Sequence, residues 1–126
     1  MGTGNIRRFQ DLEAWKECYA LALEIYGATN SFPGTEQFGI VNQMRRAAVS
    51  CTSNIAEGFS RTFAKDKARF YSIALASLTE LQSQIELAAG LQYIDQSERA
   101  QLMKHTEHAY ALIRGLVRSA QNFRSP

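Results

Sequence analysis

Hydroxyl, amide and carboxylate side chains recur at helical spacing in one stretch of the sequence and could support nucleophilic chemistry: Ser50, Ser53, Asn54 and Glu57. A serine nucleophile needs a base within hydrogen-bond reach and donors that stabilise an oxyanion. Neither histidine lies in this stretch, and no strand–turn–helix pattern presents a serine. We interpret these polar residues as contacts between helices, with Asn54 fixing the helix register. The sequence therefore predicts a protein that is not an enzyme.

A metal site is the second chemistry to consider, because His105 and His108 are three residues apart and Glu107 lies between them. On a helix, both imidazoles could reach one ion. A structural zinc site needs about four ligands, and the sequence offers no second cluster. We therefore expect ordinary half-buried histidines, no metal site and no cofactor.

Neutralisation of phosphates is the third chemistry, and the sequence supports it best. Basic side chains gather after Gly58, near Phe59 and Phe63, whose rings could stack on the bases of a single strand. A second basic group follows one face of the last predicted helix. The candidate contacts to nucleic acid are Arg45, Arg61, Lys65, Lys67, Arg69, Arg114 and Arg118. The net charge of +2 and the pI near 8.7 are only mildly basic, so an ordinary solvated surface is the alternative.

Four helices must position these residues, because apolar side chains recur at three- and four-residue steps along most of the chain. The first helix should start at Asp11 or Gln10. The expected N-cap of the second helix is Thr35, and that of the fourth is Ser97. The second helix is expected to end at Gly58 and the third at Gly90. The expected ranges are about 11–29, 35–57, 63–89 and 97–121.

Every connection between the predicted helices is short, so consecutive helices should be antiparallel neighbours. The expected fold is all-α, an antiparallel up-down-up-down four-helix bundle. A chain of 126 residues suits one domain over residues 1–126, with residues 1–8 and 122–126 as flexible tails.

The apolar side chains of the first helix cover an arc of about 200°, whereas one buried face needs only ~100°. A large exposed apolar surface usually marks an interface, so we expect a homo-oligomer with this helix in the contact. The candidate interface residues are Trp15, Cys18, Leu21, Ile25, Arg46 and Glu57. The alternative is that Trp15 and its neighbours simply cover a thick core within one chain.

The cysteines and the hydropathy of the chain bear on its compartment. Cys18 and Cys51 both fall on predicted apolar faces without a CxxC motif, which favours buried, reduced thiols; a structural disulfide is the less favoured alternative. No apolar run approaches the ~20 residues that span a bilayer, and the N-terminus lacks the apolar core of a signal peptide. We therefore expect a cytoplasmic protein without a membrane partner.

Three blocks of residues carry a family resemblance. They are Phe9–Trp15; Arg45-Arg46-Ala47-Ala48 with Ser50, Ser53-Asn54-Ile55-Ala56-Glu57-Gly58 and Arg61; and Phe70–Leu81 with Tyr93-Ile94. In order and spacing they resemble the four-helix-bundle proteins encoded in intervening sequences of bacterial 23S ribosomal RNA genes. That family often has Ser-Ile-Pro-Ser where this chain has Ser50-Cys51-Thr52-Ser53. Without the proline, the second helix should be straighter.

The resemblance implies a cyclic homopentamer, and it raises the expectation of nucleic-acid binding. A related protein, the accessory variability protein of diversity-generating retroelements, looks like a pentameric bundle that binds a reverse transcriptase and nucleic acid. The leading hypothesis is thus a non-catalytic oligomeric bundle that binds RNA or DNA, together with a nucleic-acid-processing protein as a further candidate partner. The competing hypothesis is a protein–protein scaffold whose charges serve assembly. Residues 70–98 contain acidic but no basic side chains, whereas residues 99–126 contain five basic and one acidic side chain, which suits such pairing.

Overall fold

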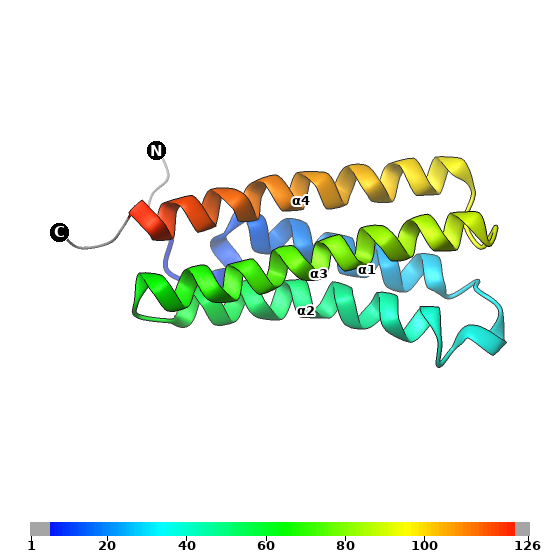
Figure 1. Ribbon diagram of the computed structural model, residues 1–126, viewed down its shortest axis with the longest axis horizontal. Helices are drawn as coiled ribbons and strands as arrows, with labels where there is room; N and C mark the ends of the chain where they lie inside the picture. The colour runs from blue at the N-terminus through cyan, green and yellow to red at the C-terminus, as the bar shows by residue number, and fades with distance from the viewer. Residues whose placement is uncertain (1–5, 123–126) are drawn as a thin grey trace.

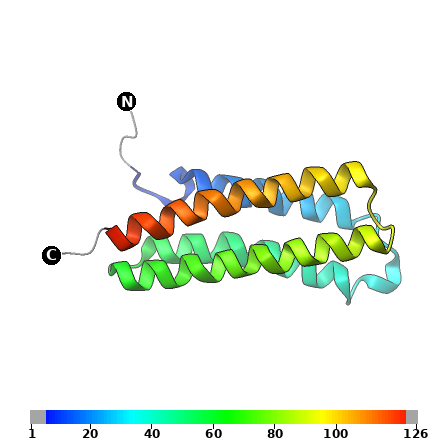
Figure 2. The same ribbon diagram turned by 45° about the horizontal axis from the view of Figure 1, so that its top comes forward.

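The computed structural model describes residues 6–122, which form a bundle of four long helices (Figure 1). Two single turns of 3-10 helix precede the first and second of them. The elements are η1 Phe9–Asp11, α1 Glu13–Thr29, η2 Gly34–Glu36, α2 Ile40–Ser60, α3 Ala64–Gly90 and α4 Gln96–Asn122. Consecutive helices run antiparallel, and Figure 2 shows α1 beside α4 in one layer and α2 beside α3 in the other. The predicted all-α four-helix bundle is confirmed.

The predicted tails are only partly open to description. Residues 1–5 and 123–126 lie outside the described residues, so the prediction of flexibility stays untested there. Residues 6–8 precede η1, where the backbone N–H groups of Arg7 and Arg8 donate to the Asp11 carboxylate. These two bonds lower the pKa of Asp11. Asn122 is still helical, which makes α4 longer than predicted.

The core is a column of aliphatic side chains contributed by all four helices. Fully burying such a side chain stabilises the fold by about 1.5–3 kcal/mol. The largest fully buried members are Leu21, Ile25, Met44, Ile55, Leu78, Leu81, Ile85 and Ile113. The full sets of buried residues recur mainly at three- and four-residue steps within each helix, which is why the periodicity of the sequence predicted the helices. No helix within residues 6–122 is long and apolar enough to cross a membrane.

The connection between α1 and α2 corrects two predicted helix starts. Leu12, and not Asp11 or Gln10, is the N-cap of α1, because Asp11 belongs to the preceding 3-10 turn. Thr35 is not an N-cap: it lies within η2, and α2 begins only at Ile40. The turn is held in place from another helix connection, because the Tyr93 hydroxyl donates to Glu36 Oε2 at 2.8 Å.

Gly58 does not end α2, which continues to Ser60. The glycine serves close packing instead, because a Cβ built there would lie 2.7 Å from Tyr71 Cε1 and 3.2 Å from Phe70 Cβ. Only a residue without a side chain lets the buried Tyr71 ring approach α2 so closely. The α2–α3 corner is therefore fixed by ring-against-backbone contact.

The α3–α4 connection also differs from its prediction. Gly90 is the last helical residue of α3, and the left-handed residue beyond it is Gln92, with φ 65°. The Gln92 and Tyr93 N–H groups donate to the carbonyls of Ala89 and Ala88, both at 2.9 Å, which is the Schellman arrangement.

Asp95, and not Ser97, caps the N-terminus of α4. Asp95 Oδ1 accepts from the Glu98 N–H at 2.8 Å, and Glu98 Oε1 accepts from the Asp95 N–H at 3.2 Å. This reciprocal pair is a capping box, and it satisfies two backbone donors that the helix start leaves open.

The polar stripe of α2 makes one contact between helices. The hydroxyls of Ser50 and Ser77 lie 2.8 Å apart and join α2 to α3. Asn54 donates to Ser50, to its carbonyl at 2.8 Å and its hydroxyl at 3.1 Å, both within α2. The prediction that Asn54 fixes the helix register was therefore wrong. Ser50 makes the hydrogen bond between α2 and α3, and Asn54 holds Ser50 in place through hydrogen bonds within α2.

Candidate nucleic-acid interface

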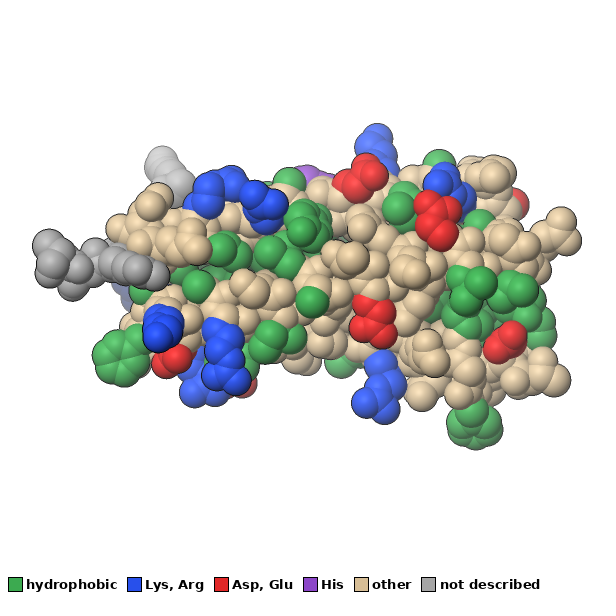
Figure 3. Space-filling view, in the orientation of Figure 1, with side chains coloured by type: hydrophobic (Ala, Val, Ile, Leu, Met, Phe, Trp, Pro, Cys, Tyr) green, Lys and Arg blue, Asp and Glu red, His purple; other side chains and the backbone are tan. Residues whose placement is uncertain are grey.

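Basic side chains concentrate at one end of the bundle. The α2–α3 connection and the C-terminal end of α4 lie together at the left of Figure 1. Figure 3 shows Lys and Arg side chains on both edges of this end, with a strip of hydrophobic side chains between them. The fold thus brings together two basic groups that lie far apart in the sequence.

Four exposed cations form what we call the basic end: Lys65 and Arg69 on α3, and Arg114 and Arg118 on α4. None of them has a carboxylate within ion-pair distance among residues 6–122. Arg69 also lies 5.6 Å from the centroid of the Phe70 ring. Four charges without a neutralising partner leave this end ready to accept an anionic ligand.

Arg61 lies at the same end but is already engaged within the chain. Its Nη2 is 2.7 Å from Glu57 Oε2, and its guanidinium lies 4.7 Å from the centroid of the Phe70 ring. Arg61 therefore stacks on Phe70. The Phe63 side chain is 70% exposed and stays open to a ligand.

Lys67 has a structural role that the sequence did not indicate. Its Nζ donates to the carbonyls of Phe59 at 2.8 Å and Gly58 at 3.4 Å, where the last carbonyls of α2 lack helical partners. A cation at the C-terminus of a helix is also favoured by the helix dipole. The pKa of Lys67 is lowered, because burial disfavours its charged form. We assign Lys67 to closing α2 more than to binding a ligand.

Arg45 does not belong to the basic end. It reaches across to the end of α1, where it donates to Thr29 Oγ1 at 2.9 Å and Asn30 Oδ1 at 3.1 Å, and lies 4.5 Å from the centroid of the Tyr26 ring. The sixteen positions from Arg45 to Arg61 correspond to about 24 Å of helix. Arg45, one of the seven candidate contacts to nucleic acid, therefore lies apart from the basic end.

An apolar groove opens at the same end as the four cations. Its volume is about 300 Å³. It is lined by Ile6, Leu12, Phe59, Lys67, Tyr71, Leu116, Ser119 and Ala120. Burial in this region raises the pKa of Tyr71 to about 12, so its hydroxyl stays neutral near pH 7. The groove can take an apolar or aromatic group, and Lys67 is the one cation among its described lining residues.

The exposed part of the α1 arc differs from the residues chosen from the sequence. Cys18, Leu21 and Ile25 are at most 1% exposed and belong to the core of one chain, so they cannot form a surface contact. The exposed apolar side chains, which we call the α1 face, are Tyr19, Leu23 and Tyr26, at 48%, 57% and 42% exposed.

The other candidate interface residues lie at the surface. Trp15 is half-buried, stacked on Tyr19 with ring centroids 5.1 Å apart, and it extends the α1 face. Arg46 is exposed on α2. Glu57 already pairs with Arg61 in its own chain.

The two histidines join α4 to α1 through carboxylates. His105 contacts Glu24, which also accepts from Gln101 at 3.0 Å, and His108 Nδ1 lies 3.4 Å from Glu17. Within the described part of the chain, no three His, Cys, Asp or Glu side chains come together as metal ligands. The absence of a metal site stays a prediction. The contacts of the two histidines with Glu24 and Glu17 give them a role in packing α4 against α1.

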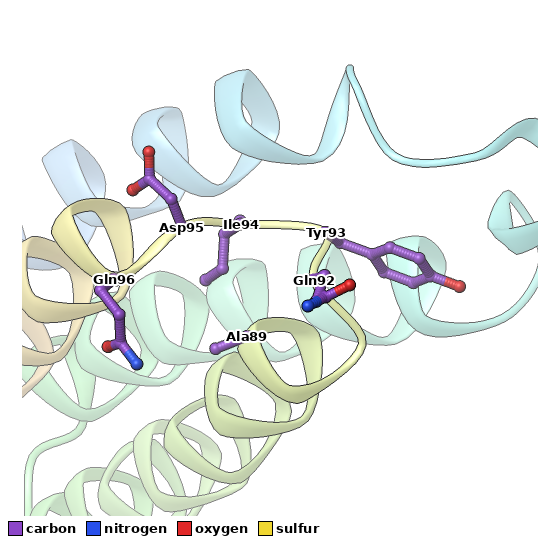
Figure 4. A pocket seen from close by; sticks show the side chains of 6 residues that line it. All are labelled: Ala89, Gln92, Tyr93, Ile94, Asp95 and Gln96. Carbon is purple, nitrogen blue, oxygen red and sulfur yellow. The ribbon is translucent and has the colours of Figure 1, made fainter.

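A second pocket, of about 390 Å³, lies at the opposite end of the bundle, beside the α3–α4 connection (Figure 4). Figure 4 shows Tyr93 pointing away from the other lining side chains. Asp95 is occupied by the capping box with Glu98. The pocket presents no nucleophile beside a base, and we assign it no chemistry.

Both the sequence and the fold of this chain are similar to those of known proteins. Residues 10–115 match the family described as 23S rRNA-intervening sequence protein. The fold is similar to the crystal structure of a protein with unknown function from the S23 ribosomal protein family of Bacteroides thetaiotaomicron. That similarity has a TM-score of 0.74 at 19% identity, and it covers 82% of this chain and 97% of that one. No curated protein matches the sequence.

Proposed function

This chain belongs to the 23S rRNA-intervening sequence protein family, and we propose that it binds RNA or DNA through its basic end, without catalysis. The observation that carries the proposal is that one end of the bundle holds four exposed cations from two helices, none with a carboxylate partner among residues 6–122: Lys65, Arg69, Arg114 and Arg118. We expect the protein to act in the cytoplasm.

Single-stranded nucleic acid fits this end better than duplex. Proteins that bind single strands combine a cationic surface for the backbone with aromatic or apolar surface for the bases. The exposed Phe63 ring and the apolar groove supply such surface at the same end of the bundle as the cations. Nothing in this arrangement reads base edges, so we expect little sequence preference.

Assembly into a cyclic homo-oligomer is the second part of the proposal. The α1 face leaves Tyr19, Leu23 and Tyr26 exposed next to the half-buried Trp15. Contiguous apolar surface of this kind is typical of protein interfaces. A ring would present one basic end per subunit, and avidity would then strengthen weak contacts along one strand. A pentamer is the number that the family resemblance implies.

The test of binding uses two pairs of charge-removing substitutions on one helix. Arg114→Gln with Arg118→Gln removes two charges from the basic end, whereas Arg99→Gln with Lys104→Gln removes two charges from the other half of α4. A fluorescent single-stranded RNA and DNA are titrated at several salt concentrations. The first pair should weaken binding and flatten the dependence of log K on log salt by about 1.4, since each phosphate contact contributes ~0.7 for single strands.

The control pair should leave both quantities near those of the unchanged protein. Equal losses from the two pairs would mean that net charge alone drives binding, and the basic end would then have no special role. Absence of binding at about 50 mM salt, where phosphate contacts are strong, would favour the competing function, a protein–protein scaffold. The exposed α1 face is the observation that supports that alternative.

The test of assembly is the mass in solution. Light scattering should give a multiple of 14.1 kDa for the unchanged protein. Leu23→Glu should reduce that mass toward one chain, because it places a charge in the proposed contact. Leu87→Glu is the matched control, since Leu87 is 56% exposed on α3, against 57% for Leu23. A single-chain mass for the unchanged protein would refute the proposed oligomer.

A further inference from the structure

The two cysteines of the chain meet in the core, across the contact between α1 and α2. Cys18 Sγ and Cys51 Sγ lie 2.7 Å apart, and each residue is 1% exposed. Both thiols are free. The residues are 33 positions apart in the sequence, so the fold alone brings them together.

We propose that Cys18 and Cys51 form a reversible intramolecular disulfide that fastens α1 to α2 when the protein meets a small peroxide. A disulfide bond is about 2.05 Å long, so the sulfurs must approach by roughly 0.65 Å from their separation of 2.7 Å. The chain holds two cysteines in all, and neither thiol has a competing partner within the same molecule.

The reaction balances with hydrogen peroxide as the oxidant. One thiol, as its thiolate, attacks a peroxide oxygen and becomes a sulfenic acid, while the O–O bond breaks and water leaves. The second thiol attacks the sulfenic sulfur, the S–S bond forms, and a second water leaves. Two thiols thus lose two electrons and two protons, and one peroxide becomes two water molecules. A thiol reductant reverses the change by exchange.

Burial controls how fast this reaction proceeds. The hydrogen bond with Cys51 raises the pKa of Cys18, and burial raises it further, so thiolate is scarce while the core is closed. Reaction then requires a local opening between α1 and α2, which admits a small neutral oxidant more readily than a bulky charged one. We expect oxidation over minutes to hours and slow re-reduction.

The bond would stabilise the protein and hold α1 in place. Closing a loop between residues 33 positions apart removes conformational freedom from the unfolded chain. We expect the midpoint of thermal unfolding to rise by about 10 °C on oxidation. α1 also carries the exposed face of Tyr19, Leu23 and Tyr26, so the bond would fix that face on the bundle.

The experiment compares the full chain before and after treatment with hydrogen peroxide. The protein is denatured, its free thiols are alkylated with a maleimide, and its mass is measured without reductant. The expected product has lost two hydrogens, takes up no maleimide, and yields on digestion one peptide pair that contains Cys18 and Cys51. Dithiothreitol should restore two alkylation sites and the original melting temperature.

A matched variant and three outcomes decide the proposal. Cys51→Ala leaves Cys18 without a partner, so peroxide should then give neither the two-hydrogen loss nor the rise in melting temperature. Two alkylatable thiols after prolonged treatment of the unchanged protein would overturn the proposal. So would irreversible sulfinic acid without a crosslink, or a disulfide between two chains on a non-reducing gel. Because all three outcomes are read on the unchanged protein, they do not depend on how well the variant folds.

Discussion

Replacing Gly58 by alanine tests whether ring-against-backbone packing fixes the corner between α2 and α3. The new Cβ would lie 2.7 Å from Tyr71 Cε1 and 2.9 Å from Tyr71 Cδ1, whereas ordinary contact begins near 3.4 Å. The ring must therefore move by roughly 0.7 Å, the difference between 3.4 and 2.7 Å. Tyr71 is only 3% exposed, so its ring cannot turn into solvent.

Two opposing effects determine how much Gly58→Ala changes the free energy of unfolding. Overpacking of this kind costs about 1–3 kcal/mol, and the better helix propensity of alanine returns about 1 kcal/mol. Gly27→Ala is the matched control, because Gly27 is the third-last residue of α1 as Gly58 is of α2. A Cβ at Gly27 meets nothing within 4 Å. The unfolding free energies of the two variants should therefore differ by about 1–3 kcal/mol, which is the packing cost alone.

Urea denaturation followed by circular dichroism measures both variants at one protein concentration. Gly27→Ala should be slightly more stable than the unchanged protein. Gly58→Ala should be less stable than Gly27→Ala by about 1–3 kcal/mol. If Gly58→Ala stabilises the protein as much as Gly27→Ala does, the close approach of Tyr71 does not constrain the corner.

Three further substitutions test contacts that hold the helices in place. Gln92→Gly should raise the free energy of unfolding by about 0.5–1 kcal/mol, because glycine adopts the left-handed backbone at φ 65° without steric conflict; urea denaturation will show the gain, and its absence would argue against strain at this turn. Arg45→Lys should lower the free energy of unfolding by about 1–2 kcal/mol, since lysine cannot keep all three hydrogen bonds around the end of α1 and the stack on Tyr26. RNA affinity should not change with it, and a loss of affinity at intact stability would return Arg45 to the binding surface. The hydrogen bond from Arg99 holds the pKa of Glu86 below 4.5, so this contribution to stability is present above pH 4.5 and is lost as the pH falls through the lowered pKa. Arg99→Gln should therefore show a smaller fall in melting temperature between about pH 6 and pH 3, and an identical fall would contradict the pairing.

The helices were predictable from sequence because burial imposes a period on the apolar residues, and the helix ends were not, because contacts between helices decide them. Gly58 has the sequence signature of a helix end, yet the neighbouring Tyr71 ring makes use of its missing side chain. Thr35 looks like a cap, but Glu36 and Tyr93 hold the segment in a short turn. Neither contact is visible in local sequence.

The end of the bundle where exposed cations gather was predictable from sequence, and the role of each cation was less so. Basic residues around the α2–α3 connection pointed to this end, but side-chain partners separate Lys65 and Arg69 from Lys67 and Arg61. The pairing of Arg61 with Glu57 follows helical spacing and was open to prediction.

The contact of Lys67 with the last carbonyls of α2 depends on a turn whose geometry the sequence does not specify. The apolar arc predicted for α1 likewise contained both core and surface residues. The width of the arc does not show which part of it the other helices cover. Leu21 and Ile25 proved to be core, and Leu23 proved to be surface.

The uneven placement of charge along the rod has a consequence for how it meets a ligand. Cations without a carboxylate partner among residues 6–122 lie at one tip, while Asp95 and Glu98 lie toward the other. Such a molecule experiences a torque near a polyanion, at distances up to about one Debye length, ~8–10 Å in physiological salt. The protein would orient its basic end toward the polyanion before contact, so that a larger share of encounters would occur in the orientation that allows binding.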